Sequence, residues 1–338
     1  MSSSSSAGPR PLQHERLVAV DAVLHACRVC RTVQARLVEG STLQKGDKSP
    51  VTVADFAAQA VVSHIIGKDF PLIPLVGEED AAALSSAEHA ALRIEVLAAV
   101  ESVLPGLSQD DVMEAIDRGS YAGGPSGRHW TLDPIDGTKG FLRLDQYAVA
   151  LALIEDGQVV LGVLGCPSLP HDVHHPERGH GSVFTAVKGH GTWVRTLDDP
   201  TEHRVRVSEV AQVSQARFCE SVERAHSNQS DSARVAELLG IETAPFRIDS
   251  QCKYASVSRG DASIYLRLPT KPGYVERIWD HAAGVAVVTE AGGRVTDTRG
   301  QPLDFSRGRG LDNNKGVVAT NGRFHDQVVD AVRTVLGV

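Results

Sequence analysis

The most informative segment of this chain is Trp130-Thr131-Leu132-Asp133-Pro134-Ile135-Asp136-Gly137-Thr138-Lys139-Gly140-Phe141. Its apolar approach predicts that Asp133 lies at the end of a buried strand. Pro134 disfavours a helix through Asp133 and fixes one φ angle of the turn that follows. Gly137 permits a backbone conformation that other residues resist. The segment therefore predicts a rigid turn directly after a buried strand.

Three oxygen-bearing groups of this turn form a candidate metal site. The turn directs the Asp133 and Asp136 carboxylates and the Ile135 carbonyl toward one point, and Mg²⁺ requires converging hard oxygen ligands. Asp, Pro and Gly are also common turn residues, so the same letters alone describe a surface turn equally well. Residues elsewhere in the chain decide between these two interpretations.

The composition indicates a soluble globular protein that does not bind nucleic acid. Its 338 residues are enough for one large or two medium domains, and 42% of them are hydrophobic. The formal net charge of −8 argues against a general nucleic-acid-binding surface. No apolar run reaches the length that spans a bilayer, so no membrane partner is expected. We expect a monomer that acts on a small molecule.

The cysteines and the N-terminus favour the reduced cytosol. Five scattered cysteines are too few for a disulfide framework: Cys27, Cys30, Cys166, Cys219 and Cys252. The Cys27–Cys30 spacing lies in a helical pattern without a second pair, so buried packing is favoured over zinc binding or redox chemistry. Residues 1–12 are Ser-rich and lack the apolar core of a secretory signal, so a disordered tail is expected. Organellar targeting stays open.

The remaining pattern predicts helices and strands that alternate in the second part of the chain. Before residue 204, helices are expected at 15–38, 50–67 and 88–104, and strands at 73–76, 146–154, 158–165, 183–187 and 192–194, with Asp156-Gly157 as a hairpin turn. Beyond it, strands are expected at 216–222, 245–249, 262–267, 293–297 and 316–320, and helices at 231–239, 251–259, 279–291 and 322–336. The simplest arrangement is an α+β half at 13–160 and an α/β half at 161–338 that share a cleft.

Further carboxylates lie at the expected ends of strands or starts of helices. Asp55 follows Thr52 in a pattern that matches a helix-capping box. Glu78 and Glu79 follow a strand, where solvation alone would explain them, and Asp280 matches a plain helix N-cap. Taken together, the acids are more numerous than caps demand. Buried carboxylates repel one another unless a cation compensates, so the set predicts bound Mg²⁺.

Four histidines lie in one loop-like segment: His171, His174, His175 and His180. A histidine cluster can bind a metal, but this setting favours a solvated surface loop. We assign the segment no role.

The acidic motifs resemble a known group of enzymes. Gly77-Glu78-Glu79, Asp133-Pro134-Ile135-Asp136-Gly137-Thr138 and Trp279-Asp280-His281-Ala282-Ala283-Gly284 resemble the lithium-sensitive, Mg²⁺-dependent phosphatase superfamily of inositol monophosphatase. Ser49-Pro50-Val51-Thr52-Val53-Ala54-Asp55-Phe56-Ala57-Ala58-Gln59, Asp249-Ser250-Gln251-Cys252-Lys253-Tyr254 and Tyr265-Leu266-Arg267-Leu268-Pro269 resemble its 3′(2′),5′-bisphosphate nucleotidases. The strings cover nearly the whole chain. The resemblance implies an α+β or α/β fold, a layered α-β-α-β-α sandwich.

The resemblance also implies a role for each matching residue. The ligands of two or three Mg²⁺ ions would be Glu78, Asp133, the Ile135 carbonyl, Asp136 and Asp280, and Li⁺ would compete at one position. Asp55 and Thr138 would orient and deprotonate the attacking water. The N–H groups of Gly137 and Thr138 would hold phosphate oxygens if they begin a helix. The nucleotide would be contacted by His226, Ser250, Lys253 and Arg267.

The implied activity removes the 3′-phosphate of 3′-phosphoadenosine 5′-phosphate, giving AMP and phosphate, and extends to 3′-phosphoadenosine 5′-phosphosulfate. Lys253 and Arg267 would bind the phosphate that does not react. Without the resemblance, an exposed helix face would explain Lys253 and a strand end would explain Arg267. Two alternatives stay open. One is an inositol phosphate substrate, as for an inositol polyphosphate 1-phosphatase or inositol monophosphatase. The other is a redox- or ligand-sensing module, with Cys166 and Cys219 as its thiols.

Overall fold

A large mixed sheet occupies the middle of the molecule, and the expected layered sandwich is confirmed around it. The computed structural model describes residues 12–39, 49–222, 229–271 and 273–338. The sheet has the order β1-β2-β3-β4-β5-β6-β7. Its strands are β1 Leu75–Gly77, β2 Arg128–Asp136, β3 Ala148–Glu155, β4 Gln158–Pro170, β5 His180–Val187, β6 Gly191–Thr196 and β7 His203–Val205. Only β1 and β2 pair in parallel, and the other neighbours are antiparallel.

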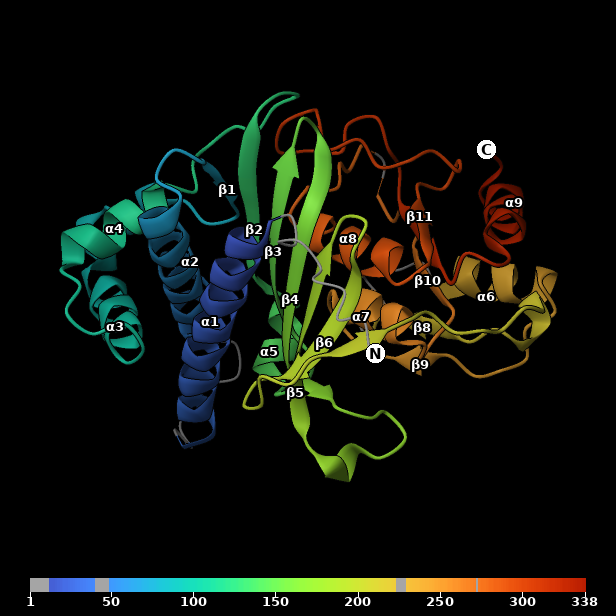
Figure 1. The fold of residues 1–338 in the computed structure, drawn as a ribbon, viewed down its shortest axis with the longest axis horizontal. Coiled ribbons are helices and arrows are strands. Elements are labelled where there is room, and N and C mark those ends of the chain that lie inside the picture. The colour runs from blue at the N-terminus through green and yellow to red at the C-terminus, as the bar shows by residue number, and fades with distance from the viewer. Residues whose placement is uncertain (1–11, 40–48, 223–228, 272) are drawn as a thin grey trace, which may run out of the picture.

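A smaller mixed sheet lies beside the first, on the C-terminal side of the molecule (Figure 1). Its order is β11-β12-β10-β8-β9. The strands are β8 Phe218–Glu220, β9 Phe246–Arg247, β10 Ile264–Arg267, β11 Arg294–Thr296 and β12 Val317–Thr320. These strands confirm the alternation of strands and helices that the sequence predicts beyond residue 204.

Helices form three layers around the two sheets. They are α1 Gln13–Glu39, α2 Ser49–Asp69, α3 Ala90–Glu101, α4 Gln109–Asp117, α5 Thr138–Leu142, α6 Gln229–Leu238, α7 Cys252–Arg259, α8 Ala282–Glu290 and α9 His325–Leu336, with 3₁₀ turns at Ala81–Leu84, Ala87–His89, Pro176–Arg178 and Val213–Gln215. Helix α1 packs on the large sheet and α2 packs on α1, while α8 covers the other face of that sheet. Helix α7 contacts both sheets, and α6 and α9 form the outer layer (Figure 1).

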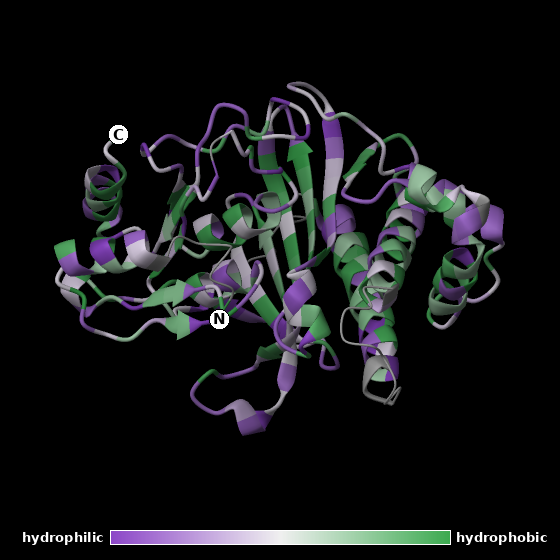
Figure 2. Cartoon of the chain, turned by 180° about the vertical axis from the view of Figure 1, so that it is seen from behind, coloured by the Kyte–Doolittle hydropathy of each residue, from purple (hydrophilic) through white to green (hydrophobic). Residues whose placement is uncertain are grey.

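The large sheet is buried on both faces because helices cover both. Every residue of β3 except Glu155 is buried, which suits a nearly continuous apolar run rather than an alternating one. The central strands and the helices beside them accordingly carry much of the hydrophobic green of the ribbon, whereas the hydrophilic purple is most frequent in the connecting loops (Figure 2).

The large sheet crosses the expected boundary between the two halves of the chain. The division at residues 160 and 161 falls inside β4, within one continuous sheet, and two separate halves stay a prediction. Helix α4 was not predicted. The sequence also suggested no membrane-length apolar run, yet residues 50–69 of α2 pass that test by length and composition. Because 72% of that window is buried inside the protein, α2 is a core helix.

The cysteines lie in the interior, whereas most of the clustered histidines lie at the surface. All five cysteines are free and buried, so the packing interpretation of the Cys27–Cys30 pair is confirmed. Burial raises the pKa of Cys219 to about 12 and raises that of Cys166 well above its ordinary value, which makes both thiols poor nucleophiles. The side chains of His174 and His175 are exposed on the β4–β5 loop, and that of His180 is exposed at the first residue of β5, as expected for a solvated segment.

Candidate active site

The C-terminal end of β2 carries the central acids on an irregular strand. Asp133 pairs with Ala150 of β3 and Asp136 pairs with Ala148, so the β2 side holds one extra residue. Pro134 lies in this bulge, where its missing N–H removes no bond from the regular ladder. The predicted rigid turn is therefore a β-bulge inside the strand, and the chain turns only at Gly137. The bulge brings Asp133 and Asp136 to the same edge of the sheet.

Gly137 is the N-cap residue of α5, and it has the unusual backbone conformation that the sequence predicts. Its φ is +96°, in the left-handed region that favours glycine. A Cβ at this position would lie 2.8 Å from the Cβ of Ser250. Glycine therefore allows the Gly137-Thr138 turn to approach the turn at Ser250, whose own φ of +63° is unusual for a residue with a side chain.

Glu78 follows β1, the parallel neighbour of β2. Because Gly77 is paired with Leu132, Glu78 emerges beside Asp133. Buried Gln59 of α2 holds this exit: its Nε2 donates to the Glu79 carbonyl at 2.7 Å, and its Oε1 accepts from the Glu79 N–H at 3.0 Å. Arg309 donates to the Gly77 carbonyl at 2.6 Å. The backbone around Glu78 is thus fixed from two distant segments.

Asp280 reaches the same place from the segment before α8. The helix begins at Ala282 with His281 as its N-cap residue, so the alternative interpretation of Asp280 as a plain helix N-cap is wrong. Buried Gln251 connects this segment to β2. Its backbone N–H donates to the Asp136 carboxylate, its Nε2 donates to the Trp279 carbonyl at 2.9 Å, and its Oε1 accepts from the Gly284 N–H at 3.2 Å.

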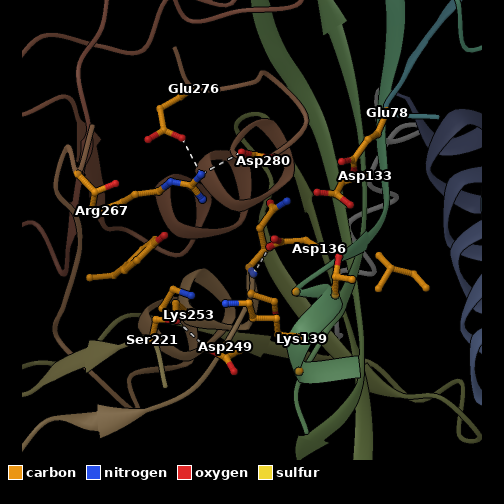
Figure 3. A pocket seen from close by; sticks show the side chains of 18 of the residues that line it. Glu78, Asp133, Asp136, Lys139, Ser221, Asp249, Lys253, Arg267, Glu276 and Asp280 are labelled. Carbon is orange, nitrogen blue, oxygen red and sulfur yellow. Dashed lines mark hydrogen bonds and ion pairs between the residues drawn. The ribbon is translucent and has the colours of Figure 1, made fainter. Parts of the chain in front are cut away.

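Two cations face the acids across one cavity. Lys253, on the first turn of α7, is only 6% exposed, so the alternative of an exposed helix face is wrong. Arg267, at the end of β10, contacts the carboxylates of Asp280 at 3.1 Å and Glu276 at 2.8 Å. Figure 3 shows the arrangement, with Glu78 and Asp133 on one side and Lys253 and Arg267 on the other.

The cavity has a volume of about 510 Å³ and contains most of the predicted site. Of the predicted residues, it is lined by Glu78, Asp133, Ile135, Asp136, Gly137, Thr138, Ser250, Lys253, Arg267 and Asp280. Asp55 is not among the lining residues. It lies in the second turn of α2, so the capping interpretation of Asp55 is wrong. His226 lies outside the described residues.

The acids destabilise one another's charges. Burial, together with Glu78 and Asp136, raises the pKa of Asp133 well above its ordinary value. Desolvation by the surrounding protein and the Asp280 and Glu79 carboxylates raise the pKa of Glu78 to about 8, although the residue as a whole is exposed. Burial and Asp280 raise the pKa of Asp136 to about 6, against the opposing effect of Lys253. Asp55 is affected too, because burial, Glu79 and Glu78 raise its pKa.

This donor set suits a divalent cation. Among the described residues, the buried Asp133 Oδ1 has no hydrogen-bond partner. A buried acceptor without a partner costs free energy, and so does uncompensated repulsion between carboxylates. A hard cation ligated by oxygen atoms removes both costs at once.

The metal-free protein should therefore lose stability as the pH rises. The folded state binds more protons than the unfolded state wherever its carboxyl pKa values are raised, so unfolding becomes easier between about pH 4, the ordinary carboxyl pKa, and about pH 8. Thermal unfolding in EDTA across this range measures the effect. Saturating Mg²⁺ should flatten the profile, and a melting temperature that rises with pH in EDTA would contradict it.

Four residues of the site were missed as functional candidates. Gln59 and Gln251 lie inside the quoted strings, but no local signal shows that their amides connect distant segments. Asp249 precedes the Ser250 turn and accepts from Ser221 Oγ at 2.7 Å. Glu276 lies four residues before Asp280 and pairs with Arg267. In the sequence, only this short spacing from Asp280 could have suggested that Glu276 belongs to the site.

In this cavity, carboxylates that suit a divalent cation face a buried lysine and an arginine. This arrangement is that of a metal-dependent phosphatase. That is the class of protein that the fold and the site define. The sequence pattern of the inositol monophosphatase family matches residues 13–336, and the chain belongs to this family.

Curated relatives match along the whole chain. A 3′(2′),5′-bisphosphate nucleotidase of Emericella nidulans is 45% identical over 352 residues, covering 96% of this chain and 99% of the relative. A 3′(2′),5′-bisphosphate nucleotidase of Oryza sativa is 44% identical over 348 residues, covering 98% of this chain and 97% of the relative.

Solved structures support the fold. An inositol monophosphatase from Anabaena has a TM-score of 0.60 at 22% identity, covering 96% of both chains. At this identity the likeness concerns the fold alone. It agrees with two mixed sheets between layers of helices.

Proposed function

We propose that this protein removes the 3′-phosphate of 3′-phosphoadenosine 5′-phosphate by hydrolysis, giving AMP and phosphate, and that it also accepts 3′-phosphoadenosine 5′-phosphosulfate. The observation that carries the proposal is the single cavity in which an acidic cluster faces Lys253 and Arg267. A bisphosphate needs both sides, one for the phosphate that reacts and one for the phosphate that stays. The full-length similarity to bisphosphate nucleotidases supports the same substrate class.

The acids would hold two or three Mg²⁺ ions. The ligands would be Glu78, Asp133, the Ile135 carbonyl, Asp136 and Asp280. Bound Mg²⁺ would stabilise charge on the phosphoryl oxygens and lower the pKa of a water molecule. Li⁺ would inhibit by competing for one position. We further propose a cytoplasmic monomer.

Asp55 and Thr138 would direct the attacking water. Thr138 Oγ would accept a hydrogen bond from the water and donate its own hydrogen to the Asp55 carboxylate. Thr138 lines the cavity, and Asp55 lies on α2, which contacts α5. The raised pKa of Asp55 makes its carboxylate a stronger proton acceptor. An attacking water requires no covalent phospho-enzyme.

The other end of the cavity would hold the nucleotide. Lys253 would meet the non-reacting phosphate as a point charge and Arg267 would meet it through several N–H donors. Ser250 contributes from the turn beside them, while the backbone N–H groups of Gly137 and Thr138 would hold oxygens of the reacting phosphate. His226 is proposed as a further nucleotide contact on the resemblance alone.

A substrate panel with Mg²⁺ tests this function. We expect phosphate release from 3′-phosphoadenosine 5′-phosphate with a kcat/KM at least about 100-fold above that for inositol 1,4-bisphosphate. Both compounds carry a second phosphate, but the spacing between their phosphates differs, so charged donors placed for one spacing discriminate against the other by several kcal/mol. Li⁺ should lower the rate. A preference for the inositol compound would transfer the assignment to that substrate, and no release from any phosphate ester would refute the proposal.

A further inference from the structure

Among the described residues, the guanidinium group of Arg267 makes its contacts through one nitrogen atom, Nη2. Nη2 contacts Glu276 Oε2 at 2.8 Å and Asp280 Oδ2 at 3.1 Å, with Tyr274 Oη at 3.5 Å. Among the described residues, Nε and Nη1 donate to none. The guanidinium group has five N–H donors in a fixed plane. Its pairing with acids therefore leaves three of them for another partner.

The two acids that contact Nη2, Asp280 and Glu276, differ in whether a bound cation would move them. Asp280 is a proposed Mg²⁺ ligand, so cation binding would draw its carboxylate away from Arg267. Glu276 is held elsewhere: His281 Nε2 lies 3.2 Å from Glu276 Oε2, and Tyr254 Oη lies 2.8 Å from His281 Nδ1. Glu276 is 6% exposed, and His281 and Tyr254 are fully buried.

These contacts form a buried chain from α7 to the cavity, which we call the Glu276 buttress: Tyr254, His281, Glu276. Such a chain fixes the Glu276 carboxylate through hydrogen bonds in a setting of low dielectric. Burial opposes ionisation of Glu276, but the His281 and Arg267 contacts outweigh it and lower its pKa to about 2. Figure 3 shows Arg267 between Glu276 and Asp280.

We propose that Glu276 is a positioning residue that determines specificity for substrates with a second phosphate. It holds Arg267 in place when Asp280 turns to a cation. The released Nη2–H then joins Nε or Nη1 as a two-point donor for the non-reacting phosphate. Without Glu276, Arg267 has only Asp280 as an acidic partner among the described residues, and it either follows Asp280 or loses its orientation. This inference rests on the proposed function for the identity of the phosphate.

Equilibrium binding of AMP and of adenosine, with Mg²⁺ present, tests the inference without turnover. AMP carries only the phosphate that does not react, and adenosine carries none. Wild type should bind AMP more tightly than adenosine. Glu276→Ala should weaken AMP binding at least about tenfold and leave adenosine binding unchanged, the effect of losing an orienting charge-assisted hydrogen bond. Glu276→Gln keeps an acceptor and should restore AMP affinity to within about threefold.

A matched control separates this role from a general loss of a buried ion pair. Glu15 contacts Arg128 at 2.8 Å, and 16% of the Glu15 side chain is exposed. Arg128 is the first residue of β2, at the end of the strand away from the cavity. Glu15→Ala should leave both affinities unchanged. Tyr254→Phe removes the far end of the buttress and should weaken AMP binding about two- to threefold. If Glu276→Ala does not fold, as judged by its thermal transition, Tyr254→Phe decides.

Kinetics with the bisphosphate give a second readout. Glu276→Ala should raise KM with kcat within about threefold of wild type, because the lost interaction holds the non-reacting end of the substrate. Unchanged preference for AMP over adenosine in Glu276→Ala would overturn the inference. If wild type hydrolysed no bisphosphate, the proposed function would fail, while the AMP measurement would still decide the role of Glu276.

Discussion

Asp133→Asn should stabilise the metal-free protein and remove nearly all phosphatase activity. Asp133 is 2% exposed, its Oδ1 has no described partner, and burial together with the neighbouring acids raises its pKa. A neutral amide ends this repulsion and can donate to Glu78, so we expect about 1–3 kcal/mol of added stability near neutral pH. The same change removes a cation ligand, and turnover should fall on the order of 10³-fold, which corresponds to several kcal/mol of lost transition-state stabilisation.

Two titrations measure these opposite effects. Thermal unfolding in EDTA should show a higher melting temperature for Asp133→Asn than for wild type. Rising Mg²⁺ should stabilise wild type strongly and the variant little, because stabilisation follows ligand affinity. Asp330→Asn, on an aspartate that is 76% exposed on α9, should change neither quantity. A variant less stable than wild type in EDTA would show that Asp133 has a structural partner.

The local parts of this site were predictable because short-range chemistry determines them. Pro134 restricts its own backbone, Gly137 permits the left-handed conformation that the turn needs, and the structure places both acids of that segment on the cavity. The Asp156-Gly157 hairpin is likewise local, with φ values of +48° and +72° that suit a tight turn between antiparallel strands. Apolar periodicity alone was enough to place α1 and the strands of the core.

Helix α4 begins with a local capping motif, although the sequence pattern predicted no helix there. Ser108 Oγ accepts from the Asp111 N–H at 3.1 Å, and Asp111 Oδ2 accepts from the Ser108 N–H at 2.8 Å. This is a capping box with aspartate in the third helical position instead of the usual glutamate. The same pattern at Thr52 and Asp55 predicts a helix start at Thr52, yet α2 begins earlier, at Ser49. A short motif therefore needs the surrounding helix to be located first.

The long-range parts were not predictable from residue patterns. Gln251 joins Asp136 to the Trp279 segment across 115 and 28 positions of sequence. Gln59 joins α2 to the exit of β1 across 20 positions. An amide that bridges distant backbone groups leaves no periodicity or spacing in the sequence. Burial of a polar side chain is the signal, and it is visible only in the structure.

Asp55→Asn should separate water activation from cation binding. Asp55 does not line the cavity, but it lies on α2, which contacts α5, the helix that begins with Thr138. An asparagine keeps the shape and loses the proton acceptor. We therefore expect kcat to fall about 10²- to 10⁴-fold, the usual contribution of a general base, while stabilisation by Mg²⁺ is retained.

The partner residue provides the matched comparison. Thr138→Ser keeps the hydroxyl and should retain kcat within about tenfold, whereas Thr138→Val keeps the shape and should lose about as much as Asp55→Asn. Because the two residues would act on one water, the double variant Asp55→Asn, Thr138→Val should be little slower than either single variant. Additive losses would mean that they act independently. If Asp55→Asn abolished stabilisation by Mg²⁺, Asp55 would be a cation ligand and the base would have to be sought elsewhere.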